Sequence, residues 1–233
     1  MSQKKENIII LICSLVIIAS IVAFFVIYSN NKIKNSFILN EHLEDTIVTI
    51  TVPKDISSKL NISSCNISLK ELSYYILVME AGVNHTASLY NPNNLNSYWN
   101  LYISNTFVKS QAKDSTMDVC IRDNIYYYEA VSNNFDLTDD EKSVILDEAS
   151  YIYSNLTAKQ VDATNLTLED LYNVRYKIGL TTKYINKLMS EDSLTEEELN
   201  IDGSYYSSLY ENYDIQIDEM WNTIELGNIT IDR

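Results

Sequence analysis

The sequence predicts a mainly α-helical domain with a few short β-strands, preceded by one N-terminal transmembrane helix. Two observations support this fold class. Residues 7–28 contain no charged side chain and are almost wholly apolar, as a membrane span requires. Between Met117 and Met189, apolar residues recur at intervals of three and four, which is the period of an amphipathic helix. Because helix start signals interrupt this pattern, we expect three successive helices that bury their apolar faces against each other.

The apolar stretch at the N-terminus is predicted to remain in the mature protein as an anchor. A helix over residues 7–28 would be about 33 Å long, enough to cross the hydrocarbon core of a bilayer. No Ala-x-Ala cleavage site follows it, unlike in a secretory signal, and the flanking lysines leave the orientation nearly undecided. Because the tail before the span is short, we expect a single-pass membrane protein with its domain outside the cytoplasm. The predicted parts are a cytoplasmic tail at residues 1–6, the anchor at 7–28, a polar stalk at 29–44 and a helical domain at 45–233.

Helix starts in the predicted domain carry a threonine or serine followed three positions later by an acidic residue, which is the pattern of a capping box. Such starts occur at Ser68, Thr138, Thr167 and Thr195. Around them the apolar stripes are Met117, Ile121, Ile125, Tyr128 and Val131, then Ile145, Ala149, Ile152 and Leu156, then Leu171, Val174, Ile178, Ile185 and Leu188. Each stripe lies on one face of a helix and predicts a buried side.

Alternating residues predict short strands at Thr46–Val52, Asp214–Ile217 and Asn228–Ile231. A lone strand cannot satisfy its backbone N–H and C=O groups. We therefore expect Thr46–Val52 to pair with a strand near the C-terminus, with Asn228–Ile231 as the expected partner.

Several of these segments together resemble the N-terminal chaperone region of the bacterial SurA/PrsA-type foldases. The resemblance is carried by Ser68–Leu72, Ile125–Ala130, Phe135–Glu141, Leu168–Tyr172, Gly203–Tyr206 and Trp221. It implies a helical, chaperone-like domain that binds unfolded or secreted polypeptides outside the cytoplasm. The glycine-rich parvulin isomerase domain of larger members has no counterpart, because the chain has only four glycines and no room for that domain after Met189. The resemblance thus implies a chaperone part without isomerase activity.

Charge and composition argue against several other classes of function. The formal net charge of −15 disfavours binding to nucleic acid, whose phosphates an acidic surface repels. The two histidines, His42 and His85, have no metal-site spacing, and the sequence has no phosphate-binding glycine loop. The acidic runs 139–141 and 196–198 lie at predicted helix starts, where carboxylates complement the helix dipole. We therefore predict no catalytic residues, no metal and no cofactor.

Tyrosine is the unusual component of the sequence, with 18 tyrosines against 5 phenylalanines. Several occur as neighbours on predicted helices, and adjacent positions of a helix cannot all face one core. Tyrosine suits adaptable binding surfaces because it combines apolar area with a polar tip. The candidate contacts with client polypeptides are Tyr74, Tyr75, Tyr126, Tyr127, Tyr205 and Tyr206. The alternative is that these tyrosines replace phenylalanine at the edge of the core.

The sequence leaves two functions from different classes open. The first is a membrane-anchored chaperone-like protein that binds unfolded secreted chains, and the second is a scaffolding subunit that docks to one membrane or envelope protein. A homo-oligomer is possible in either case, and contact with the lipid bilayer is expected through residues 7–28. Cys65 and Cys120 could pair outside the cytoplasm, but Cys120 is expected on a helix face, which favours free thiols.

Overall fold

A computed structural model describes residues 39–231, and these residues form one compact domain that is mainly helical. The predicted fold class is confirmed to this extent. Within residues 39–231, no helix combines the length and the apolar character needed to cross a membrane. The predicted tail, the predicted anchor at 7–28 and most of the predicted stalk lie outside the described residues.

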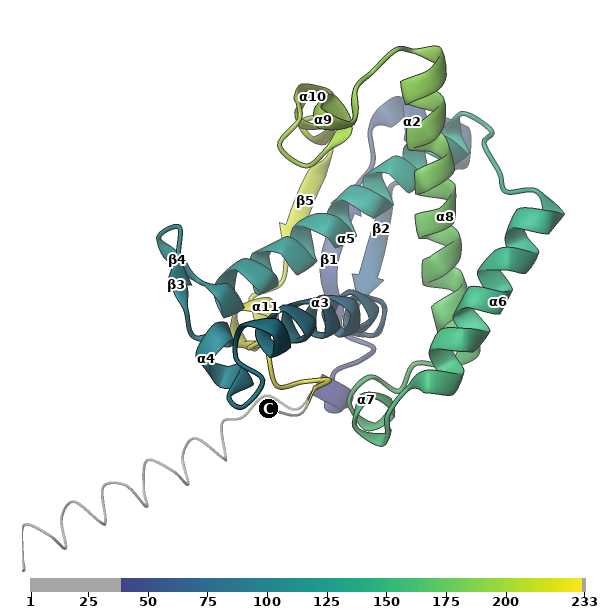
Figure 1. Cartoon of the computed structure of the whole chain (residues 1–233). Coiled ribbons are helices and arrows are strands. Elements are labelled where there is room, and N and C mark those ends of the chain that lie inside the picture. Colours follow the sequence, from purple (N-terminus) through teal and green to yellow (C-terminus); the bar gives the residue numbers. More distant parts are fainter. Residues whose placement is uncertain (1–38, 232–233) are drawn as a thin grey trace, which may run out of the picture. The chain divides into compact units, whose positions relative to one another are not determined.

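The elements follow one another in the order shown in Figure 1. The N-terminal half contains η1 (Leu39–Glu41), β1 (Thr46–Thr51), α2 (Lys54–Leu60), β2 (Ser64–Ser68), α3 (Leu69–Tyr90), α4 (Leu95–Trp99), β3 (Tyr102–Ile103) and β4 (Thr106–Phe107). The C-terminal half contains α5 (Val108–Ser132), α6 (Asp139–Asn155), α7 (Ala158–Thr164), α8 (Leu168–Glu191), α9 (Glu196–Leu199), α10 (Ser204–Tyr210), β5 (Asp214–Ile217) and α11 (Met220–Thr223).

A three-stranded antiparallel sheet joins the two ends of the domain in the order β2-β1-β5. The predicted strand at Thr46–Val52 is present as β1, and its C-terminal partner is β5, with Val48 opposite Ile217 and Ile50 opposite Ile215. The expected pairing with Asn228–Ile231 is therefore wrong. Those residues form no strand, because their N–H groups bind a buried side chain instead of another strand.

That side chain is Glu80 of α3, which has no exposed surface. One carboxylate oxygen accepts hydrogen bonds from the N–H groups of Gly227, Asn228 (2.9 Å) and Ile229 (3.1 Å). The other accepts from the N–H and the hydroxyl of Thr230, at 2.6 and 2.7 Å. Gly227 allows this wrapping of the chain because its φ of 102° is readily adopted only by glycine. The last described residues are thereby fixed to α3.

The helical core has α5 and α8 at its centre, with α3 on one side and α6 on the outer side of α8 (Figure 1). The predicted stripes are buried in part. Their buried members are Met117, Ile121 and Ile125 on α5, Ile145 and Ala149 on α6, and Leu171, Val174 and Leu188 on α8, while the other stripe residues are half-buried. Gly179 brings α8 close to α6, since a Cβ built on it would lie 2.4 Å from Cδ1 of Ile145. The three expected helices are thus present, although the short helix α7, which was not predicted, separates α6 from α8.

Helix starts agree with the capping patterns in the sequence. The side chains of Ser68, Thr138, Thr167 and Thr195 each accept a hydrogen bond from the N–H three residues later, at the starts of α3, α6, α8 and α9. The helix that carries the Met117 stripe, α5, begins at Val108 without a side-chain cap. The acidic runs 139–141 and 196–198 occupy the first turns of α6 and α9, as expected.

Two leucines of the predicted stalk at residues 29–44 pack with the domain. Leu39 and Leu43 are buried, and the N–H of Lys70 donates to the carbonyl of Leu43 at 2.8 Å. The polar composition around these two leucines concealed them in the sequence. The compact domain begins at Leu39.

Candidate interaction surfaces

Most of the tyrosines predicted to contact a client are buried. Tyr74, Tyr75, Tyr126 and Tyr206 belong to the core, whereas Tyr127 and Tyr205 are half-buried. The expected exposure of these rings is thus wrong for four of the six residues. Neighbouring rings are buried together because different elements cover different sides of one helix, so that even adjacent positions face protein. The sequence pattern shows only one such side.

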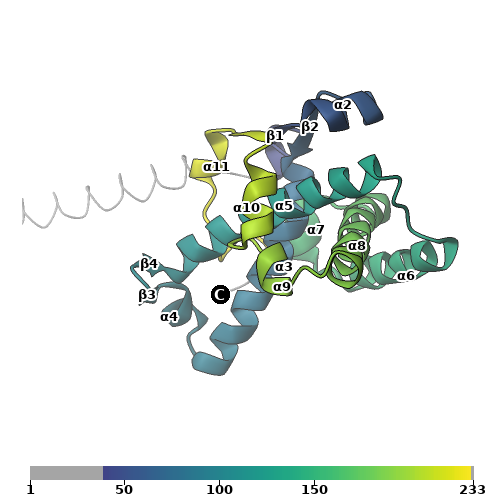
Figure 2. The same cartoon turned by 90° about the horizontal axis from the view of Figure 1, so that it is seen from above.

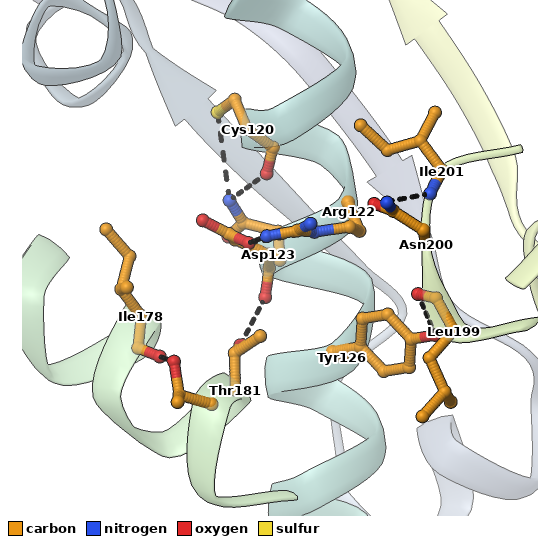
Figure 3. A network of polar contacts seen from close by, with 11 residues as sticks. Cys120, Arg122, Asp123, Tyr126, Ile178, Thr181, Leu199, Asn200 and Ile201 are labelled. Atoms are coloured by element: carbon orange, nitrogen blue, oxygen red, sulfur yellow. Dashed lines mark hydrogen bonds and ion pairs between the residues drawn. The ribbon is translucent and has the colours of Figure 1, made fainter. Parts of the chain in front are cut away.

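Tyr126 illustrates how these rings are used. Its hydroxyl donates to the carbonyl of Leu199 at 2.9 Å, which Figure 3 shows between α5 and the segment before α10. Its ring lies 5.8 Å from that of Tyr206 on α10, measured between centroids. Burial raises the pKa of both phenols, so both stay neutral. These tyrosines connect elements of the core and have little surface left for a partner.

A polar network inside the core also proves to be structural. Thr181 of α8 donates to the backbone carbonyl of Asp123 at 2.9 Å, and Arg122 forms an ion pair with the carboxylate of Asp123 at 2.9 Å (Figure 3). Asn124 donates to the carbonyl of Cys120 at 2.9 Å. Burial raises the pKa of Asp123, an effect that the ion pair with Arg122 partly offsets. The network joins α5 to α8 and leaves the Asp123 carboxylate nearly inaccessible to a substrate.

One pocket of about 380 Å³ lies between α5 and the α9–α10 segment. It is lined by Ser115, Asp118, Glu197, Asn200, Ile201, Asp202 and Gly203. Burial and the neighbouring carboxylates Asp114 and Asp202 raise the pKa of Asp118. The carboxylates disfavour an anionic ligand, and among residues 39–231 no cluster of histidine, cysteine, aspartate and glutamate is arranged to hold a metal ion. The cysteines of this part of the chain, Cys65 and Cys120, are free thiols.

The first exposed apolar surface lies on α6, which with α8 forms a two-helix arm. We call it the arm surface; it consists of Val144, Leu146, Tyr151 and Tyr153. Residues seven apart lie on the same side of a helix, so Val144 and Tyr151 form one edge of the arm surface and Leu146 and Tyr153 form another, on nearly the opposite side of α6. The two edges flank the buried residue Ile145, which faces α8. Tyr151 is 72% exposed, so this edge is open to a partner.

Carboxylates accompany the arm surface, and ion pairs hold the arm in shape. Exposed Asp140 and Asp147 lie on the same side of α6 as Val144 and Tyr151. Glu141 pairs with Lys183 of α8 at 2.8 Å, and Glu148 pairs with Arg175. The arm surface is therefore apolar with an acidic border, and these ion pairs join α6 to α8.

The second exposed apolar surface lies on the opposite side of the domain from the arm, as both Figure 1 and Figure 2 show. We call this region the aromatic lobe; it comprises the C-terminal half of α3, α4 and the β3–β4 hairpin. Its exposed apolar side chains are Leu89, Tyr90, Tyr102, Ile103 and Phe107. The hairpin is fixed to α5 by a hydrogen bond from the Val108 N–H to the Leu101 carbonyl at 3.0 Å.

Rings pair within the lobe, and one large side chain supports it. Tyr102 and Phe107 face each other across the hairpin with ring centroids 5.2 Å apart, and Tyr90 lies 5.6 Å from Tyr98 of α4. Trp99, the last residue of α4, is fully buried. None of the exposed lobe residues was among the predicted contacts, because they show no regular helical or strand period.

No family model, no curated protein and no solved structure matches this chain. The likeness to SurA/PrsA-type foldases therefore remains a prediction from the sequence. The class that the fold defines is a mainly helical domain with exposed apolar side chains on the arm surface and on the aromatic lobe.

Proposed function

We propose that this protein is a membrane-anchored, extracytoplasmic binding protein for unfolded or secreted polypeptides, and that it has no isomerase activity. The observation that carries the proposal is the arm surface, where four large apolar side chains are exposed on a helix that packs chiefly against α8. Exposed apolar area on a soluble domain is a common mark of a contact site. The membrane anchor at 7–28 and the resemblance to foldases supply the location and the class of client.

The charges at the arm surface restrict which polypeptides it suits. Asp140 and Asp147 border the edge formed by Val144 and Tyr151, so a client segment with apolar and basic residues is attracted and an acidic one is repelled. Such binding is weak for any one segment. Anchoring to the membrane that clients cross raises their effective concentration and allows weak binding to suffice.

The experiment uses the full chain in lipid nanodiscs and an unfolded model protein that aggregates. We expect the chain to slow aggregation and to leave prolyl isomerisation of a test peptide at its uncatalysed rate. Replacing Val144→Ser together with Tyr151→Ser should remove most of the protection. The matched control is Leu89→Ser with Tyr90→Ser in the aromatic lobe. This variant should protect the model protein from aggregation as the parent chain does, because its side chains are similarly exposed but lie outside the arm surface.

The second candidate function is a scaffold for one specific membrane or envelope protein. It is favoured by the ion pairs Glu141–Lys183 and Glu148–Arg175, because a preformed, rigid surface suits a single partner without reorganisation. Isolation of the chain from its native membrane separates the two functions. One partner in fixed ratio, together with no effect on aggregation even in excess, would support the scaffold and contradict the chaperone. Measurable isomerase activity would contradict both.

A further inference from the structure

The aromatic lobe differs from the rest of the domain in charge. The chain contains 32 acidic residues, yet no aspartate or glutamate occurs between Glu80 and Asp114. This interval contains the whole of the lobe beyond the middle of α3 and the first turns of α5. The basic residues within it are Lys109 and Lys113, both partly exposed on α5 next to the hairpin. The exposed aromatic side chains of the lobe thus lie on a segment without carboxylates in a strongly acidic protein. At the border of this segment, the ammonium of Lys113 lies 5.2 Å from the centroid of the Trp221 ring and close to Asp114 and Glu225.

We propose that the aromatic lobe docks on the surface of the lipid bilayer and orients the domain on the membrane. Tyrosine and other aromatic side chains are favoured at the membrane–water interface, where the ring meets apolar chains and the hydroxyl stays hydrated. Lys109 and Lys113 add attraction to anionic headgroups. The acidic remainder of the domain is repelled by the same headgroups, which leaves the lobe as the face that can approach them.

The predicted anchor makes this contact geometrically possible, and the proposal rests on the membrane anchoring in the proposed function. Residues 29–38 separate the predicted span from the first described residue, Leu39. A chain of this length reaches at most about 35 Å when fully extended. A folded domain of this size has a radius of gyration of roughly 16 Å, so its surface remains within reach of the bilayer.

A lipid surface is favoured over a polypeptide partner by the form of the lobe. Its exposed side chains lie on a hairpin and a helix end, and the neighbouring positions in the sequence include the uncharged Asn91, Asn94 and Asn105. Insertion of such a tip among headgroups removes no charged group from water, whereas at the arm surface the carboxylates Asp140 and Asp147 would oppose it.

The test places one additional tryptophan on each surface of the full chain. Tyr102 in the lobe is 62% exposed and Tyr151 on the arm is 72% exposed, so Tyr102→Trp and Tyr151→Trp are matched replacements of one exposed aromatic ring by another. The chain is reconstituted into vesicles of zwitterionic and anionic phospholipids with bromine atoms high on the acyl chains. The tryptophan fluorescence of the parent chain is subtracted from that of each variant, which leaves the emission of the added tryptophan. This emission is compared between vesicles with and without brominated lipid.

We expect brominated lipid to remove about half or more of the emission added by Tyr102→Trp and little of that added by Tyr151→Trp, since interfacial side chains lie about 5–10 Å deep. Lys109→Gln with Lys113→Gln should reduce this quenching in vesicles that contain anionic lipid. Equal quenching at both positions, or none at position 102, would overturn the proposal. Absence of quenching combined with a photo-crosslink from position 102 to a protein in native membranes would assign the lobe to a polypeptide partner instead.

Different measurements would refute membrane docking by the aromatic lobe and polypeptide binding by the arm surface. The aggregation assay with the arm variant reports on client binding and does not involve Tyr102. Extraction of the chain from the vesicles by alkaline carbonate would contradict the anchor at 7–28. The quenching at position 102 reports on the lobe whether or not the chain is extracted.

Discussion

The carboxylate of Glu80 offers the sharpest test of how the C-terminal segment is held. It accepts five hydrogen bonds from residues 227–230 and has no exposed surface. Glu80→Gln preserves the shape of the side chain but removes the charge and turns one acceptor oxygen into an N–H donor. The amide oxygen can keep the three donors of Gly227, Asn228 and Ile229, and the new NH₂ group then faces the N–H of Thr230.

The magnitude follows from these bonds. Three hydrogen bonds to a charged acceptor become bonds to a neutral one, which costs about 1 kcal/mol each. The buried N–H of Thr230 loses its acceptor, which costs a further 1–3 kcal/mol or so. The sum is an upper limit of about 4–6 kcal/mol, because release of the segment from α3 replaces the lost bonds with bonds to water. We expect a loss of about 3–5 kcal/mol.

Two measurements on the full chain in detergent micelles check this expectation. Urea unfolding followed by circular dichroism gives the free energy of unfolding, and hydrogen exchange gives the protection of the amides at 227–230. Glu80→Gln should lower the free energy of unfolding and largely abolish the protection of the amides at 227–230. The matched control is Glu211→Gln, an exposed glutamate whose replacement should change stability by less than about 0.5 kcal/mol. If Glu80→Gln behaved like this control in both measurements, the assigned role of the carboxylate would be refuted.

Three further predictions concern α6, the thiols and pH. Gly179→Ala should destabilise the fold by about 1–2 kcal/mol, because the new Cβ would collide with Cδ1 of Ile145. Ile145→Val removes that atom, so in a double-mutant cycle Gly179→Ala should cost no stability from this collision when Val occupies position 145. Burial raises the pKa of both the Cys65 and Cys120 thiols, which lowers their reactivity. In a Cys13→Ala background, Cys65 should therefore react slowly with a thiol reagent, and Cys120 should react only after unfolding. Fast labelling of Cys120 in the folded chain would contradict this. Hydrogen bonds from Tyr176 and Lys142 lower the pKa of Asp136 to about 2, below its unfolded value of about 3.9. Its contribution to stability is thus present above about pH 4 and lost as the pH falls towards 2, and Asp136→Asn should flatten the unfolding free energy across that window.

The helices and their starts could be predicted from the sequence because their causes are local. A capping box at Thr138 or Thr195 involves residues three positions apart, and the stripes on α5 and α8 repeat within a turn or two. The strand β1 and the strand segment of β5 were visible for the same reason. The unpredicted helix α7 also begins with a capping box, at Thr157 and Gln160, so the sequence held the signal for it.

The partners of these elements could not be predicted, because they depend on residues far apart in the chain. Two C-terminal segments alternate equally well, and only the carboxylate of Glu80, which binds the segment 227–230, decides that β5 pairs with β1. The same holds for Tyr126, which is buried because the distant α9–α10 segment covers the side of α5 that a helical stripe does not describe.

The two contact surfaces show the same division between sequence and tertiary structure. The acid-free interval between Glu80 and Asp114 is a property of the sequence, and so is the amphipathic character of α6. Which side chains remain in contact with solvent is decided only when α4 and the β3–β4 hairpin project from α3 and α5, and when α6 packs chiefly against α8 (Figure 1). The sequence by itself therefore determined the helices, their caps and the charge of each segment. The tertiary structure alone decided which tyrosines are buried and which apolar side chains face a partner, because burial is set by the neighbours that folding brings together.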